Sequence, residues 1–149
     1  MVARPLILVL NGPNLNLLGF REPGVYGKAT LAEAENLVRA KAGAHGLDID
    51  FFQSNSEGAL IDKLHSVYDT GAGIVINPGG LTSTSIALLD AVLAVDLPTV
   101  EVHVTNIHAR EPFRHVSYVS RAALAVIAGA GIAGYGFAVD VLADVLRSR

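Results

Sequence analysis

The sequence predicts an α/β protein in which helices cover both faces of a five-stranded parallel sheet, giving three layers. Five short apolar runs alternate along the chain with segments of helical periodicity, which is the pattern of successive βα units. The apolar runs are nearly continuous, as expected for strands that are buried on both faces. Five such units favour a flavodoxin-like strand order. The length of 149 residues fits a single core, so we expect residues 1–149 to form one domain.

The predicted elements follow one another in regular order. Strands are expected at residues 6–10, 49–52, 74–76, 99–104 and 124–128. The first helix should open at a capping box of Thr30 and Glu33 and close near Gly46. A second helix is expected from about residue 56 to residue 71, a third after residue 82, and a fourth at the C-terminus through residue 146.

The stretch at residues 122–139 contains 18 residues without a charge, which is long enough to suggest a membrane span. Four glycines interrupt it, and a β-branched pair followed by a glycine turn indicates a strand, a turn and a helix instead. Residues 129–134 also match the dinucleotide pattern GxGxxG. No later strand follows to supply the acidic residue that holds a ribose, so we interpret these glycines as helix packing and expect no nicotinamide cofactor.

The composition excludes several classes of function. The net charge of −3, from 11 basic and 14 acidic residues, does not favour nucleic acid or an anionic membrane as a partner. The absence of cysteine excludes disulfides, thiolate metal sites and cysteine nucleophiles, and it fits a cytoplasmic location. Residues 6–10 are too short an apolar run for the core of a signal peptide.

Polar segments follow three of the predicted strands. Residues 11–14 follow the first strand, residues 77–80 the third, and Thr105, Asn106 and His108 the fourth. Sheets of this kind bind ligands beyond the carboxyl ends of their strands, at the point where the strand order reverses. The sequence therefore predicts a ligand crevice between these segments.

Two side chains near the end of the fourth strand suit acid/base chemistry. Glu101 and His103 share one face of the strand because side chains alternate, so the carboxylate and the imidazole should be neighbours. From this pair alone we favour a structural interpretation, in which the carboxylate satisfies a strand-end histidine, over the catalytic one. The five histidines do not form a compact tetrahedral set, so no metal site is expected.

A second group of candidates lies on loops. The segment at residues 15–28 is long for a βα connection and could close over a crevice as a lid, carrying Arg21 and Tyr26. Arg110 and Arg114 follow the fourth strand. Solvated loop charge is the alternative interpretation, and spacing alone leaves both open.

Taken in order, these motifs resemble the type II 3-dehydroquinate dehydratases over essentially the whole chain. The matching segments are Asn11-Gly12-Pro13-Asn14-Leu15, Leu18-Gly19, Arg21-Glu22-Pro23, Tyr26-Gly27, Gln53-Ser54-Asn55, Asn77-Pro78-Gly79-Gly80, Glu101-Val102-His103, His108-Ala109-Arg110-Glu111 and Arg114. The resemblance implies a hydro-lyase without a cofactor, which removes water from 3-dehydroquinate by syn elimination through an enolate. It also implies the shikimate pathway or quinate catabolism, and a dodecamer built from trimers.

The resemblance assigns a role to each catalytic candidate. Tyr26 would be the base that removes a C2 proton, and Asn14 would hold the water that stabilises the enolate. His103 would protonate the departing C1 hydroxyl, oriented by Glu101. Tyrosine ionises with a reference pKa of about 10, so a tyrosine base needs a nearby cation. Arg21 is the natural cation because it lies on the same loop, with Arg110 as the second.

The resemblance also assigns the substrate contacts. Asn77 and Thr105 would hold the substrate carboxylate, together with the backbone amides of Val104 and Thr105. Arg114 would bind ring hydroxyls, and Asp90 would reach the site of an adjacent subunit.

One position departs from the family pattern. Residues 82–85 read Thr-Ser-Thr-Ser, and Ser83 stands where the family usually carries histidine. Serine is shorter and uncharged, so recognition of a ring hydroxyl could be weaker or mediated by water. Ser83 thus supports an alternative, a weakly catalytic relative that binds a hydroxylated cyclic carboxylate as a sensor. A flavin or phosphate carrier is less favoured, because the crevice motifs lack a phosphate-binding glycine loop.

Overall fold

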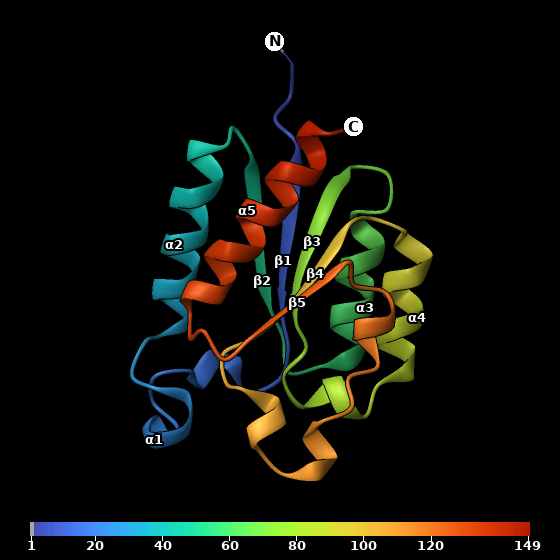
Figure 1. Cartoon of the computed structure of the whole chain (residues 1–149). Coiled ribbons are helices and arrows are strands. Elements are labelled where there is room, and N and C mark those ends of the chain that lie inside the picture. The colour runs from blue at the N-terminus through green and yellow to red at the C-terminus, as the bar shows by residue number, and fades with distance from the viewer. Residues whose placement is uncertain (1) are drawn as a thin grey trace.

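A five-stranded parallel sheet forms the centre of the computed structural model, which describes residues 2–149 (Figure 1). The strand order is β2-β1-β3-β4-β5. The strands are β1 (Leu6–Asn11), β2 (Asp48–Gln53), β3 (Gly71–Asn77), β4 (Thr99–His103) and β5 (Ala125–Ala128). This arrangement confirms the predicted flavodoxin-like α/β fold and its single α/β domain.

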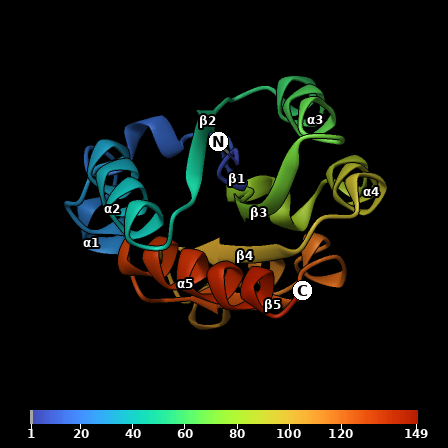
Figure 2. The same cartoon turned by 90° about the horizontal axis from the view of Figure 1, so that it is seen from above.

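Four longer helices cover the two faces of the sheet. Figure 2 shows α2 (Leu31–Ala44) and α5 (Ala133–Arg147) on one side, and α3 (Glu57–Ser66) and α4 (Ile86–Val95) on the other. The side chains of β1 explain why the strands are continuously apolar. Ile7 and Val9 pack into the core under α2 and α5, whereas Leu8 and Leu10 pack into the core under α3 and α4. None of the four is more than 1% exposed.

The helix starts follow the predicted capping chemistry. In the capping box of α2, the N–H of Glu33 donates to Thr30 Oγ1 at 3.2 Å and the N–H of Thr30 donates to Glu33 Oε2 at 3.2 Å. The second helix is shorter than predicted, since α3 ends at Ser66 and a turn separates it from β3. The third helix starts at Ile86, after a short 3-10 helix, η2 (Gly79–Ser83). Its cap is Ser85, whose Oγ accepts from the N–H of Leu88 at 2.9 Å.

Strand β3 is longer than the predicted residues 74–76, because its two glycines weaken the apolar pattern at its start. A Cβ atom on Gly73 would lie 3.1 Å from Ile7 and 3.3 Å from Leu142. The missing side chain therefore lets β1 and α5 pack closely on this strand. Strand β4 ends at His103, one residue before the predicted end, and β5 starts at Ala125, one residue after the predicted start.

The uncharged stretch at residues 122–139 forms β5, a glycine turn and the start of α5, as predicted. Gly129 and Gly131 have positive φ angles of 90° and 62° in that turn. Gly134 lies against Ile127 and Val102, where a Cβ atom would be in ordinary contact at 3.4 Å. Among residues 2–149, no helix is long and apolar enough to cross a membrane.

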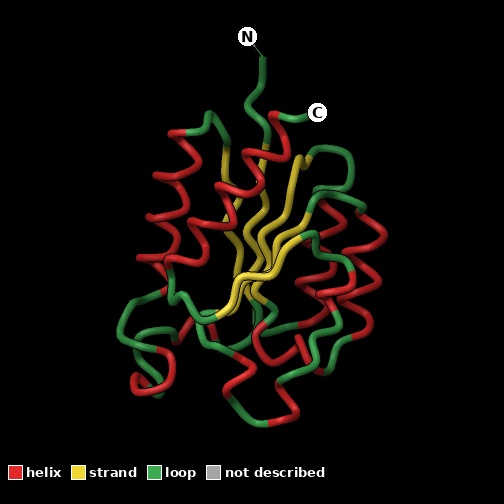
Figure 3. The backbone as a smooth tube through the Cα atoms, in the orientation of Figure 1, coloured by secondary structure: helices red, strands yellow, loops and turns green. Residues whose placement is uncertain are grey.

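The polar segments gather at the carboxyl ends of the strands, where Figure 3 shows most of the irregular chain. Asn11 and Asn77 end the adjacent strands β1 and β3 and are paired in register. The segment at residues 15–28 contains two short helical elements, η1 (Leu15–Leu17) and α1 (Pro23–Tyr26), where the sequence suggested only a loop. The crevice therefore lies at the predicted switch point of the sheet.

Candidate active site

A pocket of about 200 Å³ opens at this edge of the sheet. Ten of the twelve predicted site residues line it: Asn14, Arg21, Tyr26, Asn77, Ser83, His103, Val104, Thr105, Arg110 and Arg114. Glu101 lies behind His103, and Asp90 is exposed on α4 outside the pocket of its own chain. The fold thus collects residues from five separate segments of the chain.

The pocket is basic although the chain is acidic overall. Three arginines line it, and no aspartate or glutamate does so within residues 2–149. The net charge of the chain is −3. A concentration of guanidinium groups in a concave site favours an anionic ligand, because each charge acts over a short distance with limited screening.

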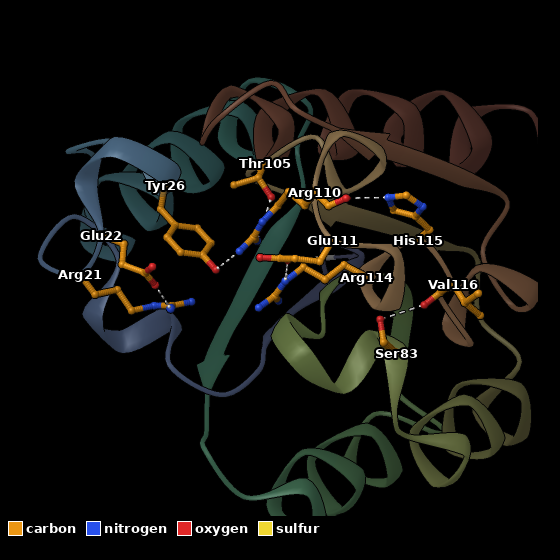
Figure 4. Close-up of polar contacts among 10 residues, drawn as sticks. All are labelled: Arg21, Glu22, Tyr26, Ser83, Thr105, Arg110, Glu111, Arg114, His115 and Val116. Atoms are coloured by element: carbon orange, nitrogen blue, oxygen red, sulfur yellow. Dashed lines mark hydrogen bonds and ion pairs between the residues drawn. The ribbon is translucent and has the colours of Figure 1, made fainter.

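Two arginines contact Tyr26 in different ways (Figure 4). Arg110 Nη2 donates to the hydroxyl oxygen of Tyr26 at 2.9 Å. Arg21 lies over the ring, with its Cζ atom 4.1 Å from the ring centroid, and pairs with Glu22 at 3.3 Å. The structure therefore places both expected cations at Tyr26, with Arg110 on the hydroxyl and Arg21 on the ring face.

Local geometry explains how these side chains reach Tyr26. Arg110 Nη1 donates to Thr105 Oγ1 at 3.4 Å, which directs the guanidinium toward the pocket. Gly19 has a φ angle of 90°, and a Cβ atom there would lie 2.8 Å from the carbonyl oxygen of Lys28. Gly19 therefore lies close to the end of the segment at residues 15–28, where a larger residue would not fit.

His103 and Glu101 form a buried pair, as the alternation of the strand predicted. His103 Nε2 lies 2.8 Å from Glu101 Oε2, and Glu101 is 0% exposed. Burial is the largest influence on Glu101 and opposes its ionisation. The hydrogen bonds from His103, Ser117 and Ser120, with the attraction of His103, outweigh burial and hold the pKa of Glu101 below its usual value.

Sequence reasoning missed the two serines that contact Glu101. Ser117 Oγ donates to Glu101 Oε1 at 2.7 Å, and Ser120 Oγ lies 2.9 Å from Oε1 and 3.0 Å from Oε2. They lie 16 and 19 residues after Glu101, so no local spacing links them to it. The available signal was chemical, since a buried carboxylate requires hydrogen-bond donors.

A buried tyrosine that the sequence did not single out supports the floor of the pocket. The Tyr135 hydroxyl donates to Asn11 Oδ1 at 2.7 Å and accepts from Asn77 Nδ2 at 2.9 Å. Burial raises the pKa of Tyr135 above the ordinary tyrosine value, against an opposing contribution from Asn77, so this hydroxyl stays neutral. Asn77 Oδ1 also accepts from the N–H of Gly79 at 3.2 Å. Both polar atoms of the Asn77 side chain are therefore hydrogen-bonded within the chain.

The loops after β1 and β3 touch, which fixes the place of Asn14. A Cβ atom on Gly12 would lie 2.1 Å from the carbonyl oxygen of Pro78, so only glycine fits there. Asn14 adopts a left-handed conformation with φ of 70°, and its N–H donates to Asn55 Oδ1 at 2.9 Å. These backbone contacts leave the Asn14 side chain at the pocket.

The opposite wall of the pocket carries hydroxyls and a third guanidinium. Ser83 Oγ donates to the carbonyl oxygen of Val116 at 3.0 Å, and Arg114 Nε donates to Glu111 Oε2 at 2.5 Å. Thr82 Oγ1 is buried and has no hydrogen-bond partner within the described chain. This wall can therefore offer both hydroxyl and guanidinium contacts to a polar ligand.

The pocket can present two groups for proton transfer, Tyr26 and His103, to one bound molecule. Tyr26 and His103 line one pocket, and each has a charged or ionisable partner. Residues 2–149 contain no group of three or more His, Cys, Asp or Glu side chains that could hold a metal ion.

Comparison with known sequences agrees with this geometry. The family model described as "Dehydroquinase class II" matches residues 5–143. The chain is 65% identical over 138 residues to "3-dehydroquinate dehydratase 1" of Corynebacterium efficiens, covering 93% of this chain and 91% of that protein. It is 54% identical over 146 residues to "3-dehydroquinate dehydratase 2" of Pseudomonas putida, covering 98% of each.

Solved structures agree as well. The type II dehydroquinase from Butyrivibrio crossotus superposes with a TM-score of 0.91 at 40% identity, covering 95% of this chain and 99% of that one. The type II dehydroquinase from Propionibacterium acnes gives a TM-score of 0.90 at 40% identity, covering 97% and 99%. The sequence matches and the shared fold lead to one assignment: the chain is a hydro-lyase of the class II dehydroquinase family.

Proposed function

We propose that this enzyme converts 3-dehydroquinate to 3-dehydroshikimate by syn elimination of water through an enolate. The observation that carries the proposal is the pairing of Arg110 with the Tyr26 hydroxyl at 2.9 Å, in the pocket that His103 also lines. A base and an acid thus face one site, as an elimination requires. The relatives named 3-dehydroquinate dehydratase identify the substrate class.

In the first step, the Tyr26 phenolate removes a proton from C2, and the electrons move into the neighbouring carbonyl to give an enolate. A guanidinium at about 4 Å stabilises a phenolate by about 4 kcal/mol at an effective dielectric near 20, compared with about 1 kcal/mol in bulk water. Arg110 at the hydroxyl and Arg21 over the ring supply this charge. Asn14 holds the water that hydrogen-bonds the enolate oxygen.

In the second step, the enolate collapses and the C1 hydroxyl leaves as water. His103 donates the proton that the leaving hydroxyl takes up, and Glu101 orients the imidazole through the contact at 2.8 Å. Tyr26 retains the C2 proton, so both groups must exchange protons with solvent before the next turnover.

The remaining pocket residues hold the substrate. Asn77, Thr105 and the backbone amides of Val104 and Thr105 bind the carboxylate, while Arg114 and Ser83 face the ring hydroxyls. The segment at residues 15–28 acts as a lid, since it carries Arg21 and Tyr26 and contains two glycines with positive φ angles, Gly19 and Gly27. Closing this lid excludes water and strengthens the interaction between Tyr26 and its cations.

A direct assay tests the assignment. Chelator-treated protein is mixed with 3-dehydroquinate, and the ultraviolet absorbance of the conjugated product is followed. We expect turnover without added metal, and Tyr26→Phe protein serves as the control for uncatalysed dehydration. Absence of turnover despite tight binding of 3-dehydroquinate would favour the alternative, a sensor for a hydroxylated cyclic carboxylate, for which Ser83 is the supporting feature.

We also propose a dodecamer built from trimers, acting in the cytoplasm in the shikimate pathway or in quinate catabolism. Asp90 is exposed on α4, where it is free to meet the site of an adjacent subunit. Light scattering combined with activity measurement tests the assembly. A fully active monomer would exclude both the dodecamer and the shared-site role of Asp90.

A further inference from the structure

Glu101 is a fully buried carboxylate whose contacts are two hydroxyls and one ring nitrogen, all of which can donate a hydrogen bond. Its side chain is 0% exposed, and its oxygens are contacted by His103 Nε2 at 2.8 Å, Ser117 Oγ at 2.7 Å and Ser120 Oγ at 2.9 and 3.0 Å. An ionised carboxylate only accepts hydrogen bonds, whereas a protonated one must donate at one of its contacts. Two hydroxyls and one ring nitrogen therefore suit the anionic form.

No permanent cation contacts Glu101 within the described part of the chain. Its one ionisable contact is His103, and the adjacent strands β3 and β5 carry no ionisable side chain. Helix α5 packs against the opposite face of the sheet. The remaining charged groups near this end of β4 are exposed or contact other partners: Asp90, Arg121, Arg110 and Arg114. The serine hydroxyls thus provide much of the polar surroundings that offset burial.

The ionisation of Glu101 determines the hydrogen position on His103. Because the carboxylate only accepts, Nε2 must carry a hydrogen, and Nδ1 is left as the ring nitrogen that exchanges a proton with the substrate. A neutral Glu101 could instead donate to Nε2. The hydrogen of a neutral imidazole would then move to Nδ1, and the imidazolium that protonates the leaving hydroxyl would lose the adjacent anion that stabilises it.

The segment that carries the two serines is itself fixed to the pocket wall. The N–H of Tyr118 donates to the carbonyl oxygen of Thr82 at 2.9 Å, and Ser83 Oγ donates to the carbonyl oxygen of Val116 at 3.0 Å. Ser117 lies between these two anchors in the chain. The hydroxyls are therefore presented to Glu101 by a segment that the pocket wall holds in place.

We propose that Ser117 and Ser120 are positioning residues for the dehydration, because they hold Glu101 as the anion that fixes the orientation and tautomer of His103. Neither serine lines the pocket, so each acts through Glu101 and His103. The inference rests on the proposed function in taking His103 as the acid.

The test uses Ser117→Ala, Ser120→Ala and the double variant, with Ser120→Thr as the variant that keeps a hydroxyl. Ser66→Ala is the matched control, since Ser66 Oγ also donates to an oxygen but is exposed on α3, away from the pocket. Carbon NMR of the Glu101 carboxyl and nitrogen NMR of the His103 ring are recorded against pH without substrate. The initial rates of dehydration are measured on the same samples.

We expect each lost hydroxyl to raise the titration midpoint of Glu101 by about one pH unit, the size of one hydrogen bond to a charged group. The His103 Nε2 resonance should report the same shift, because Nε2 contacts the titrating carboxylate. We expect the acidic limb of the kcat–pH profile to move to higher pH by the same amount, with little change in KM, because the serines act on Glu101 and do not touch the substrate. Ser120→Thr and Ser66→Ala should behave like wild type.

An unchanged Glu101 midpoint in both single variants would overturn the proposal, as would an unchanged kcat–pH profile. An equal shift in Ser66→Ala would also overturn it. If the midpoint shifts but wild-type protein does not dehydrate 3-dehydroquinate, the proposed function fails, and with it the catalytic role of the serines. The single variants suffice if the double variant does not fold, which urea unfolding reports.

Discussion

Removing the Arg110 guanidinium should reduce turnover more than removing that of Arg21. The structure places Arg110 Nη2 2.9 Å from the Tyr26 hydroxyl, whereas Arg21 lies over the ring with Cζ 4.1 Å from its centroid. A hydrogen bond to a charged group contributes about 1.5 to 3 kcal/mol, which corresponds to about a 10- to 150-fold change in rate. A cation over an aromatic ring contributes about 0.5 to 2 kcal/mol.

The expected values therefore differ between the two variants. Arg110→Ala should lower kcat by about 10- to 150-fold. Arg21→Ala should lower kcat by about 2- to 30-fold. The smaller effect has a second cause, since Arg21 also pairs with Glu22 and its side chain is 30% exposed. Solvent weakens such an interaction.

The assay is the initial rate of product absorbance at saturating 3-dehydroquinate, with each variant first checked for folding by urea unfolding. Arg39→Ala is the control, because Arg39 is on α2 and contacts Glu35 and the carbonyl oxygen of Ile49 instead of the pocket. A larger loss in Arg21→Ala than in Arg110→Ala would refute the reasoning from these distances. It would show that the phenolate is stabilised through the ring face.

Three further substitutions test other parts of the site. Tyr26→Phe keeps the ring and removes the proposed base, so kcat should fall far more than substrate affinity, measured by calorimetry; near-normal turnover would exclude Tyr26 as the base. Tyr135→Phe leaves Asn11 Oδ1 and Asn77 Nδ2 without their hydrogen-bond partner. The free energy of unfolding, measured in urea, should therefore fall by about 2 to 4 kcal/mol, and a change within about 0.5 kcal/mol would contradict this. Ser83→His should lower KM about two- to tenfold with little change in kcat, since it restores one neutral hydrogen bond to a ring hydroxyl. If the wild type were inactive on 3-dehydroquinate and the variant active, the natural substrate would be a different one.

Much of the fold was predictable because its signals are local. The capping box at Thr30 and Glu33 marked the start of α2, and the continuous apolar runs identified strands buried on both faces. The alternation of β4 also predicted that Glu101 and His103 are neighbours. Local signals did not predict the start of β3. The glycines there allow close packing between elements that are far apart in the chain.

The contacts that hold the site together were not predictable in the same way. Ser117, Ser120 and Tyr135 contact partners that are 16 to 124 residues away, so their roles depend on tertiary structure. The contact between Arg110 and Tyr26 was not predictable from local spacing either. Arg21 lies on the same loop as Tyr26, whereas the loop after β4 brings Arg110 to the hydroxyl from 84 positions away.

The bridge from Asn11 through Tyr135 to Asn77 has a consequence for the order in which the enzyme matures during synthesis. The ribosome produces β1 first, but the hydroxyl that joins the ends of β1 and β3 belongs to α5, 124 residues after Asn11. A nascent chain that has reached β4 therefore carries His103 before Tyr135 can complete the support of the pocket floor. Catalytic competence should be acquired abruptly, when the last helix emerges and docks, and not gradually as the chain grows.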